Sequence, residues 1–260
     1  MTVAANLSML RAAMNSAEAQ WPTTVADAMR AREEIAAATA NIINPTPDDV
    51  AFAVAEALAA GRDPLDDDTV RRLTTARVLA GPTGDALRGG VDRAAETRVV
   101  KALTAEADEI LSLLGNAFNA AGGVLSAAWR ILGELDLTDS QAVLKMGPDS
   151  SRAWTDALDA QRRIRAIDDG WYALAELTRF ASSTDAPTSR MADVSFEQYQ
   201  QLGRKADPWA IVRSGITLDL ADRFTIRDRV ARLQEEREAL RTKPERDFLN
   251  EYRRSHGVPA

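Results

Sequence analysis

The sequence of 260 residues contains no cysteine and only one histidine, His256. The lack of cysteine excludes disulfides, thiolate-bound zinc, iron–sulfur clusters and thiol catalysis. A single histidine excludes metal sites built on paired histidines and leaves serine nucleophiles without a general base. Neither a phosphate-binding loop nor a dinucleotide-binding glycine motif is present. We therefore predict that the protein is not an enzyme, with no catalytic, cofactor-binding or metal-binding residues.

Aromatic residues and lysine are also scarce. Aromatic side chains make up 5% of the chain and four lysines stand against 28 arginines, whereas alanine occurs 48 times. Alanine and arginine favour helices, and few residues here favour strands. The net charge of −7 opposes binding to nucleic acid and to anionic membranes, so neither is an expected partner. The charge is uneven, because residues 1–60 carry −4 and residues 223–260 carry +3.

Signals for helix boundaries recur along the chain. The range 46–49 supplies an N-cap threonine, a proline for the first helical position and two aspartates for the first turn. Gly61 marks the end of that helix. No segment alternates apolar and polar residues as a half-buried strand does. The sequence predicts an all-α fold.

The longest apolar pattern lies in residues 91–132. Apolar residues recur there at alternating spacings of three and four, and a second row beside them repeats every seven residues. Two adjacent rows indicate a helix that is covered on several sides. We therefore predict an elongated multi-helix bundle, with coiled-coil-like packing, around this long central helix. At Gly122–Gly123 we expect either a kink or the close approach of a neighbouring backbone.

The stretch Ile110–Trp129 of this helix carries no charge and has about the 20 residues that span a bilayer. Asparagine, serine and glycine dilute its hydrophobicity, and no basic flank marks one end as cytoplasmic. We therefore expect a buried core helix. No secretory signal is apparent, so the predicted location is the cytoplasm.

The C-terminal third has a different organisation. Residues 150–181 read as one long helix, or as two that are separated at 168–170, and residues 182–190 have the composition of a linker. The predicted domains are accordingly a helical bundle over 1–181, a linker over 182–190 and a smaller helical module over 191–260. The last helix of this module carries a heptad-like apolar stripe that we predict to face a partner. The stripe consists of Ile226, Val230, Leu233 and Leu240.

Two constellations point to other functions. Residues 138–166 resemble a helix-turn-helix, with Gly147 in the turn and four arginines on the second helix, which favours a DNA-binding regulator as the alternative function. The arginines are Arg152, Arg162, Arg163 and Arg165. The acidic run Asp63–Asp68 has ligands for magnesium, as a carboxylate-dependent helical enzyme requires. The simpler interpretation is that these aspartates cap the start of the following helix.

Elimination leaves a non-catalytic function. We predict a structural or adaptor protein that self-associates or docks protein partners through amphipathic helices, without a cofactor. The alanine- and arginine-rich, cysteine-free composition is typical of an assembly component of a GC-rich bacterium or its phage.

Overall fold

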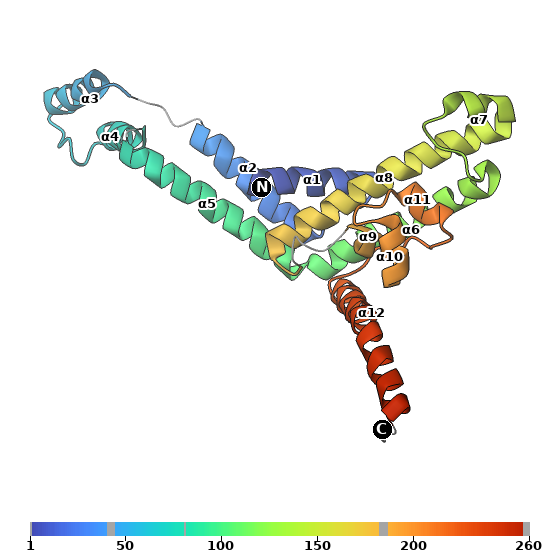
Figure 1. Cartoon of the computed structure of the whole chain (residues 1–260). Coiled ribbons are helices and arrows are strands. Elements are labelled where there is room, and N and C mark those ends of the chain that lie inside the picture. Colours follow the sequence, from blue (N-terminus) through green and yellow to red (C-terminus); the bar gives the residue numbers. More distant parts are fainter. Residues whose placement is uncertain (1, 41–44, 81, 182–186, 257–260) are drawn as a thin grey trace. The chain divides into compact units, whose positions relative to one another are not determined.

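The computed structural model describes residues 2–40, 45–80, 82–181 and 187–256 (Figure 1). Within these ranges the secondary structure is helical apart from one isolated antiparallel bridge between Ala192 and Leu218. The predicted all-α class is confirmed.

The chain forms two compact units. Unit 1 combines Met1–Trp21 with Ala107–Ala260, and unit 2 is Pro22–Glu106. This division differs from the predicted one. The range 1–181 is shared between the two units, and the predicted module over 191–260 belongs to the same unit as the helices before it.

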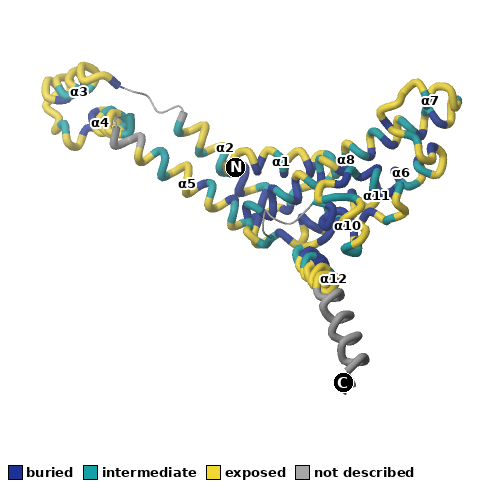
Figure 2. Tube along the Cα trace, viewed as in Figure 1, coloured by how far each residue is buried: buried dark blue, intermediate teal, exposed yellow. Residues whose placement is uncertain are grey.

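Unit 1 is built on two long helices that pack together, α6 (Ala107–Leu132) and α8 (Pro148–Thr178). α1 (Val3–Ser16) lies along α8, and the short α7 (Ser140–Met146) precedes α8. Figure 2 shows the buried residues concentrated where these helices meet. The largest buried side chains of the two long helices are Ile110, Leu114, Phe118 and Leu125 of α6 and Ile164, Ile167, Trp171 and Leu174 of α8.

Glycines allow two close approaches in this unit. α8 continues without a break through Gly170, where a Cβ atom would lie 2.1 Å from the Cβ of Ala13 on α1. α6 likewise continues through Gly122, where a Cβ would lie 3.1 Å from the Cβ of Leu218. The sequence left open a kink or a close approach at Gly122–Gly123, and the structure has the close approach. It also left open one or two helices around 168–170, and the structure has one.

The C-terminal segment folds back onto these helices. It contains α9 (Pro187–Met191), α10 (Phe196–Leu202), α11 (Pro208–Arg213) and α12 (Thr225–His256). The indole N–H of Trp171 donates to the backbone oxygen of Ala221 at 2.6 Å, and that of Trp209 donates to the backbone oxygen of Leu135 at 3.0 Å. These bonds explain why the segment is part of unit 1.

The predicted linker over 182–190 needs a correction. Residues 187–190 begin α9, and Thr188, Ser189 and Arg190 are buried. Their polar composition reads as a linker, but their polar groups are used inside the fold: the Thr188 hydroxyl, for example, donates to the backbone oxygen of Gly203 at 2.8 Å. The rest of the predicted linker, 182–186, lies outside the described residues.

Unit 2 contains α2 (Thr23–Ala40), α3 (Pro47–Ala59), α4 (Asp68–Ala80) and α5 (Pro82–Ala105). α2 packs along α5, which also contacts α4, and α3 packs on α4. Val25 and Met29 of α2 and Val99 and Leu103 of α5 are buried. α3 and α4 have a small hydrophobic core of their own, described below.

The predicted single helix over 91–132 is wrong. A turn at Glu106 ends α5 and separates it from α6, and the two helices belong to different units. The Thr24 hydroxyl of α2 donates to the Glu106 carboxylate at 2.7 Å and ties this turn to unit 2. The apolar spacing continues across the turn although Leu103 and Ile110 are buried in different cores. Periodicity alone therefore could not locate the boundary.

Among the helices of the described residues, α6 alone is long and apolar enough to cross a membrane. Core helices of globular proteins pass the same test. One side of α6 is buried in unit 1, with Ile110, Leu114, Phe118 and Leu125 fully covered. The structure thus buries one side of α6, and the core-helix interpretation stays a prediction.

Candidate functional site

Negative charge is concentrated in the middle of unit 2. Residues 45–69 carry seven acidic side chains and one arginine, a net charge of −6 in a chain whose total is −7. This range contains α3 and the connection to α4. Electrostatics therefore distinguish the α3–α4 region from the rest of the protein.

A capping box fixes the start of α3. The Thr46 hydroxyl accepts from the backbone N–H of Asp49 at 3.2 Å, and the Asp49 carboxylate accepts from the backbone N–H of Thr46 at 2.7 Å. Pro47 occupies the first turn, as its fixed φ angle favours. The hydrogen bonds from the side chain and backbone of Thr46 lower the pKa of Asp49, so this carboxylate stays charged.

Asp67 has the corresponding role at the start of α4. Its buried carboxylate accepts from the backbone N–H groups of Thr69 at 2.9 Å and Val70 at 3.2 Å and forms an ion pair with Arg62. The N–H of Val70 is the strongest of the contacts that lower the pKa of Asp67 against the effect of burial. Within the described residues no group of three or more acidic or histidine side chains is placed to hold a metal ion. The run Asp63–Asp68 thus has a visible role as a helix cap.

A groove runs between α3 and α4. One face of α3 forms its first wall, with residues at positions i, i+3, i+4 and i+7, and the start of α4 forms the second. Its volume is about 550 Å³. The wall residues of α3 are Asp49, Phe52, Ala53 and Glu56, and those of α4 are Thr69 and Leu73. The lining thus combines apolar residues with the acids Asp49 and Glu56, and it also includes the ion pair of Arg62 with Asp67.

The core beneath this groove is small. It consists of Ala53, Ala57 and Val70, with Val54 and Leu73 packed against it. The large apolar side chains nearby are left in solvent instead: Phe52 is 69% exposed, Leu58 62% and Leu65 80%. Figure 2 shows exposed residues along most of α3. Burying a side chain such as phenylalanine gains about 1.5–3 kcal/mol, so this surface holds unused binding free energy.

The interface predicted on α12 lies largely inside unit 1. Ile226 is fully buried and Leu233 is 9% exposed, while Val230 is half-buried. Leu240 is 51% exposed. The predicted stripe is therefore corrected: Ile226 and Leu233 are buried within unit 1, where α12 packs on α9 and α10, and Leu240 is the exposed residue of the four.

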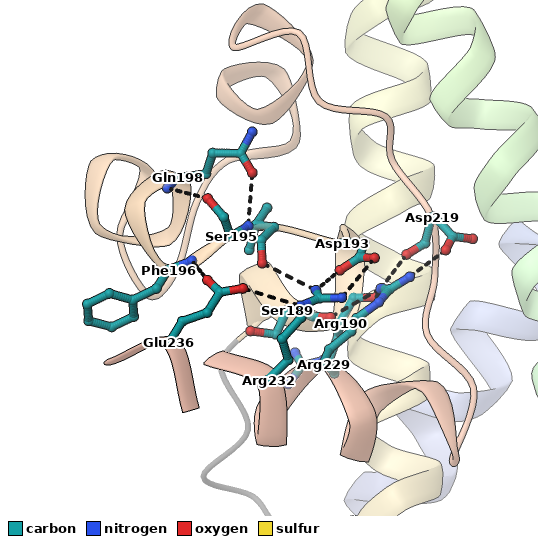
Figure 3. Close-up of polar contacts among 11 residues, drawn as sticks. Ser189, Arg190, Asp193, Ser195, Phe196, Gln198, Asp219, Arg229, Arg232 and Glu236 are labelled. Atoms are coloured by element: carbon teal, nitrogen blue, oxygen red, sulfur yellow. Dashed lines mark hydrogen bonds and ion pairs between the residues drawn. The ribbon is translucent and has the colours of Figure 1, made fainter. Parts of the chain in front are cut away.

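Arg229 shows why the first half of α12 is held in place (Figure 3). Its buried guanidinium donates to the backbone oxygens of Ser189 at 3.2 Å, Arg190 at 3.4 Å and Asp219 at 2.9 Å. It also forms an ion pair with the Asp219 carboxylate. One side chain of α12 thus binds two separate segments of the chain.

Two further charges of α12 are used in the same way. Arg232 forms an ion pair with Asp193, which raises the pKa of Arg232 and lowers that of Asp193. The Glu236 carboxylate accepts from the backbone N–H of Phe196, at the start of α10, at 2.6 Å (Figure 3). The mixed charges of this helix therefore hold the fold together as far as Glu236.

Unit 1 has a second, more polar cleft of about 670 Å³ beside α8 and α9. Two ion pairs lie among its lining residues, Arg165 with Asp207 and Arg190 with Asp168. Arg190 donates to both oxygens of Asp168 at 2.8 Å and stacks against Trp171 with 5.2 Å between the guanidinium carbon and the ring centre. Burial, and then the negative charge of Asp168, raise the pKa of the neighbouring Asp169. The pair of Arg190 and Asp168 thus has a structural role in this cleft, which Arg204 and Lys205 also line.

The predicted helix-turn-helix corresponds to α7 and α8. Only Gly147, with φ of 103°, separates the two helices. Three of the four arginines of the predicted recognition helix form ion pairs within unit 1: Arg162 with Asp159, Arg163 with Glu18 and Arg165 with Asp207. Arg152 is exposed. The arginines of α8 thus mainly neutralise acids of the same chain.

Comparisons of the chain with protein-family models, curated proteins and solved structures find no match. Function must therefore be inferred from the site itself. The sequence indicates the helix cap at 46–49 and the acidic run at 63–68, but not the groove that they border. The available signal was the coincidence of net charge −6 over residues 45–69 with Phe52, Leu58 and Leu65.

Proposed function

We propose that this protein is a non-catalytic structural or adaptor protein that docks a helix of a protein partner in the groove between α3 and α4. The observation that carries the proposal is the exposed Phe52 in a groove whose first wall is one continuous helix face. α3 has 13 residues. Such a helix is about 20 Å long, which matches two to four turns of a partner helix.

The balance of burial supports docking over a purely internal role for this surface. The α3–α4 pair buries mainly alanine and valine and leaves larger apolar side chains in solvent. A partner helix laid in a groove buries such side chains with its own residues at i, i+3, i+4 and i+7. The acidic edges formed by Asp49 and Glu56 favour a partner with positive charges beside its apolar stripe.

A labelled peptide tests this docking. The probe is a cationic amphipathic peptide with a leucine stripe, and its control has the same composition in scrambled order, so that charge is kept and the apolar face is lost. Fluorescence anisotropy measures binding to the full chain. We expect the ordered peptide to bind and the scrambled peptide to bind at least tenfold more weakly, because only an ordered apolar face fills the groove.

Two variants locate the binding site. Phe52→Ser removes the exposed ring at nearly unchanged helix propensity and should weaken binding ten- to a hundredfold, corresponding to about 1.5–3 kcal/mol of lost burial. Leu144→Ser is the matched control, because Leu144 on α7 is 71% exposed and lies in unit 1. Circular dichroism checks that both variants fold. Absent binding of the ordered peptide, or equal effects of the two variants, would overturn the proposal.

A further inference from the structure

The bonds and ion pairs described above for Arg229, Arg232 and Glu236 lie in the first half of α12 (Figure 3). Glu236 binds α10, and every residue from Arg237 to Arg241 is exposed. The helix continues to His256. The 20 residues from 237 to 256 correspond to about 30 Å of helix. This length exceeds that of α3, so the segment can span the whole groove.

The charge of this segment is opposite to that of the groove. Residues 237–256 contain six basic and four acidic side chains, a net charge of +2, whereas residues 45–69 carry −6. Its sequence also contains large apolar residues, namely Leu240, Phe248, Leu249 and Tyr252. A helix that combines large apolar residues with an excess of positive charge complements a groove lined by apolar and acidic residues.

We infer that the occupant of the α3–α4 groove is the C-terminal segment 237–256 of a second copy of this chain. The inference rests on the proposed docking function and names its partner. Each copy then offers one groove and one segment, so the contact between copies is head-to-tail. A head-to-tail contact forms a ring when its rotation closes and a filament when it does not.

Two variants separate the halves of this contact. Phe52→Ser impairs the groove and leaves the segment intact. Arg253→Glu together with Arg254→Glu reverses the charge of the segment and leaves the groove intact. Leu144→Ser is again the control, because it changes an equally exposed leucine outside both surfaces. Changes at exposed residues such as Phe52 and Leu144 have little effect on folding.

Light scattering coupled to size-exclusion chromatography measures the mass of each full-length variant over a range of concentrations. The mass of one chain is 28.2 kDa. We expect the mass of the wild type and of Leu144→Ser to rise with concentration and to fall in high salt, which screens the charges. We expect both interface variants to remain single chains, with association weakened at least tenfold.

Mixing the two interface variants gives the decisive result. The Phe52→Ser chain has an intact segment and the charge-reversed chain has an intact groove, so together they should form one contact and stop at twice the mass of a single chain. A mixture that remains monomeric overturns the inference. A wild type that is monomeric at all concentrations also overturns the inference. This includes a monomer that binds the cationic peptide only after residues 237–260 are removed, because in that case the segment fills the groove of its own chain.

The outcomes distinguish this inference from the proposed function. If the full chain binds the cationic peptide through Phe52 but never associates with itself, the groove is a docking site for another protein and only the second copy is wrong. If neither the peptide nor a second chain binds, both the docking function and its occupant are refuted.

Discussion

Replacing Gly170 by alanine tests how closely α1 approaches α8. A Cβ atom at Gly170 would lie 2.1 Å from the Cβ of Ala13 and 3.7 Å from the backbone oxygen of Met9. Carbon atoms in contact are normally about 3.5–4.0 Å apart, so the two helices would have to separate by about 1.5 Å. The Cβ of Ala13 is fixed to its backbone and cannot rotate away.

The size of the effect follows from two opposing contributions. Inserting one methyl group into a packed interface costs about 1–3 kcal/mol, and the rigid obstacle at Ala13 places Gly170→Ala near the upper end. Replacing glycine by alanine inside a helix gains about 1 kcal/mol. We therefore expect a net loss of about 2 kcal/mol in the free energy of unfolding. For a unit of this size the loss lowers the melting temperature by about 4–8 °C.

Tryptophan fluorescence during urea unfolding is the appropriate assay. All five tryptophans lie in unit 1, so their fluorescence reports that unit alone. Gly123→Ala is the control, because Gly123 is an exposed residue of α6 with no atom within 4 Å of its added Cβ. It should stabilise unit 1 by up to about 1 kcal/mol. Gly122→Ala, with Leu218 at 3.1 Å, should fall between the two.

The double variant Ala13→Gly with Gly170→Ala supplies a further check. Removing the Cβ of Ala13 opens the space that the new methyl group needs, so the double variant should be more stable than Gly170→Ala alone. A positive coupling energy of this kind is the signature of direct contact. If Gly170→Ala is instead as stable as Gly123→Ala, the contact of α1 with α8 at this register is refuted.

Three further predictions concern buried and capping charges. Arg229→Met should destabilise unit 1 by about 2–3 kcal/mol, because it removes the bonds to three backbone oxygens. Arg237→Met, on the exposed part of α12, is the control and should change stability by less than about 0.5 kcal/mol in the same urea assay. Asp169→Asn should stabilise unit 1 at pH 7, since the raised pKa of Asp169 means that ionisation destabilises the fold as pH rises through that pKa; a gain that persists at pH 3 would contradict this sign. Asp67 has a lowered pKa, so its contribution to unit 2 should be present above the ordinary aspartate pKa and lost as pH falls through the folded value. Far-UV circular dichroism should show this acid loss for the wild type and a smaller one for Asp67→Asn.

The candidate site illustrates how far sequence reasoning reached. The capping box at Thr46 and the cap at Asp67 within the acidic run were both readable from the sequence, because these contacts join residues two or three positions apart. The groove was not readable. The groove requires α3 and α4 to lie side by side. No short-range pattern in the sequence indicates that placement.

The prediction that the stripe on α12 faces a partner needed correction for a related reason. Apolar spacing identified Ile226 and Leu233 as one face of a helix, and this is how they lie. Whether such a face meets a partner or the chain's own core depends on segments remote in sequence, here Ser189, Arg190 and Asp219 around Arg229. Periodicity defines a face without saying what covers it.

The sequence by itself determined the helical class, the main caps and the exclusion of thiol and paired-histidine chemistry, since composition and short-range hydrogen bonds fix these properties. Tertiary structure alone decided three others. The apolar pattern over 91–132 is divided at Glu106 between two units. The C-terminal segment packs on α6 and α8, and Phe52 lines an open groove. The physical reason is that burial is a property of pairs of surfaces, and a sequence pattern describes only one surface of each pair.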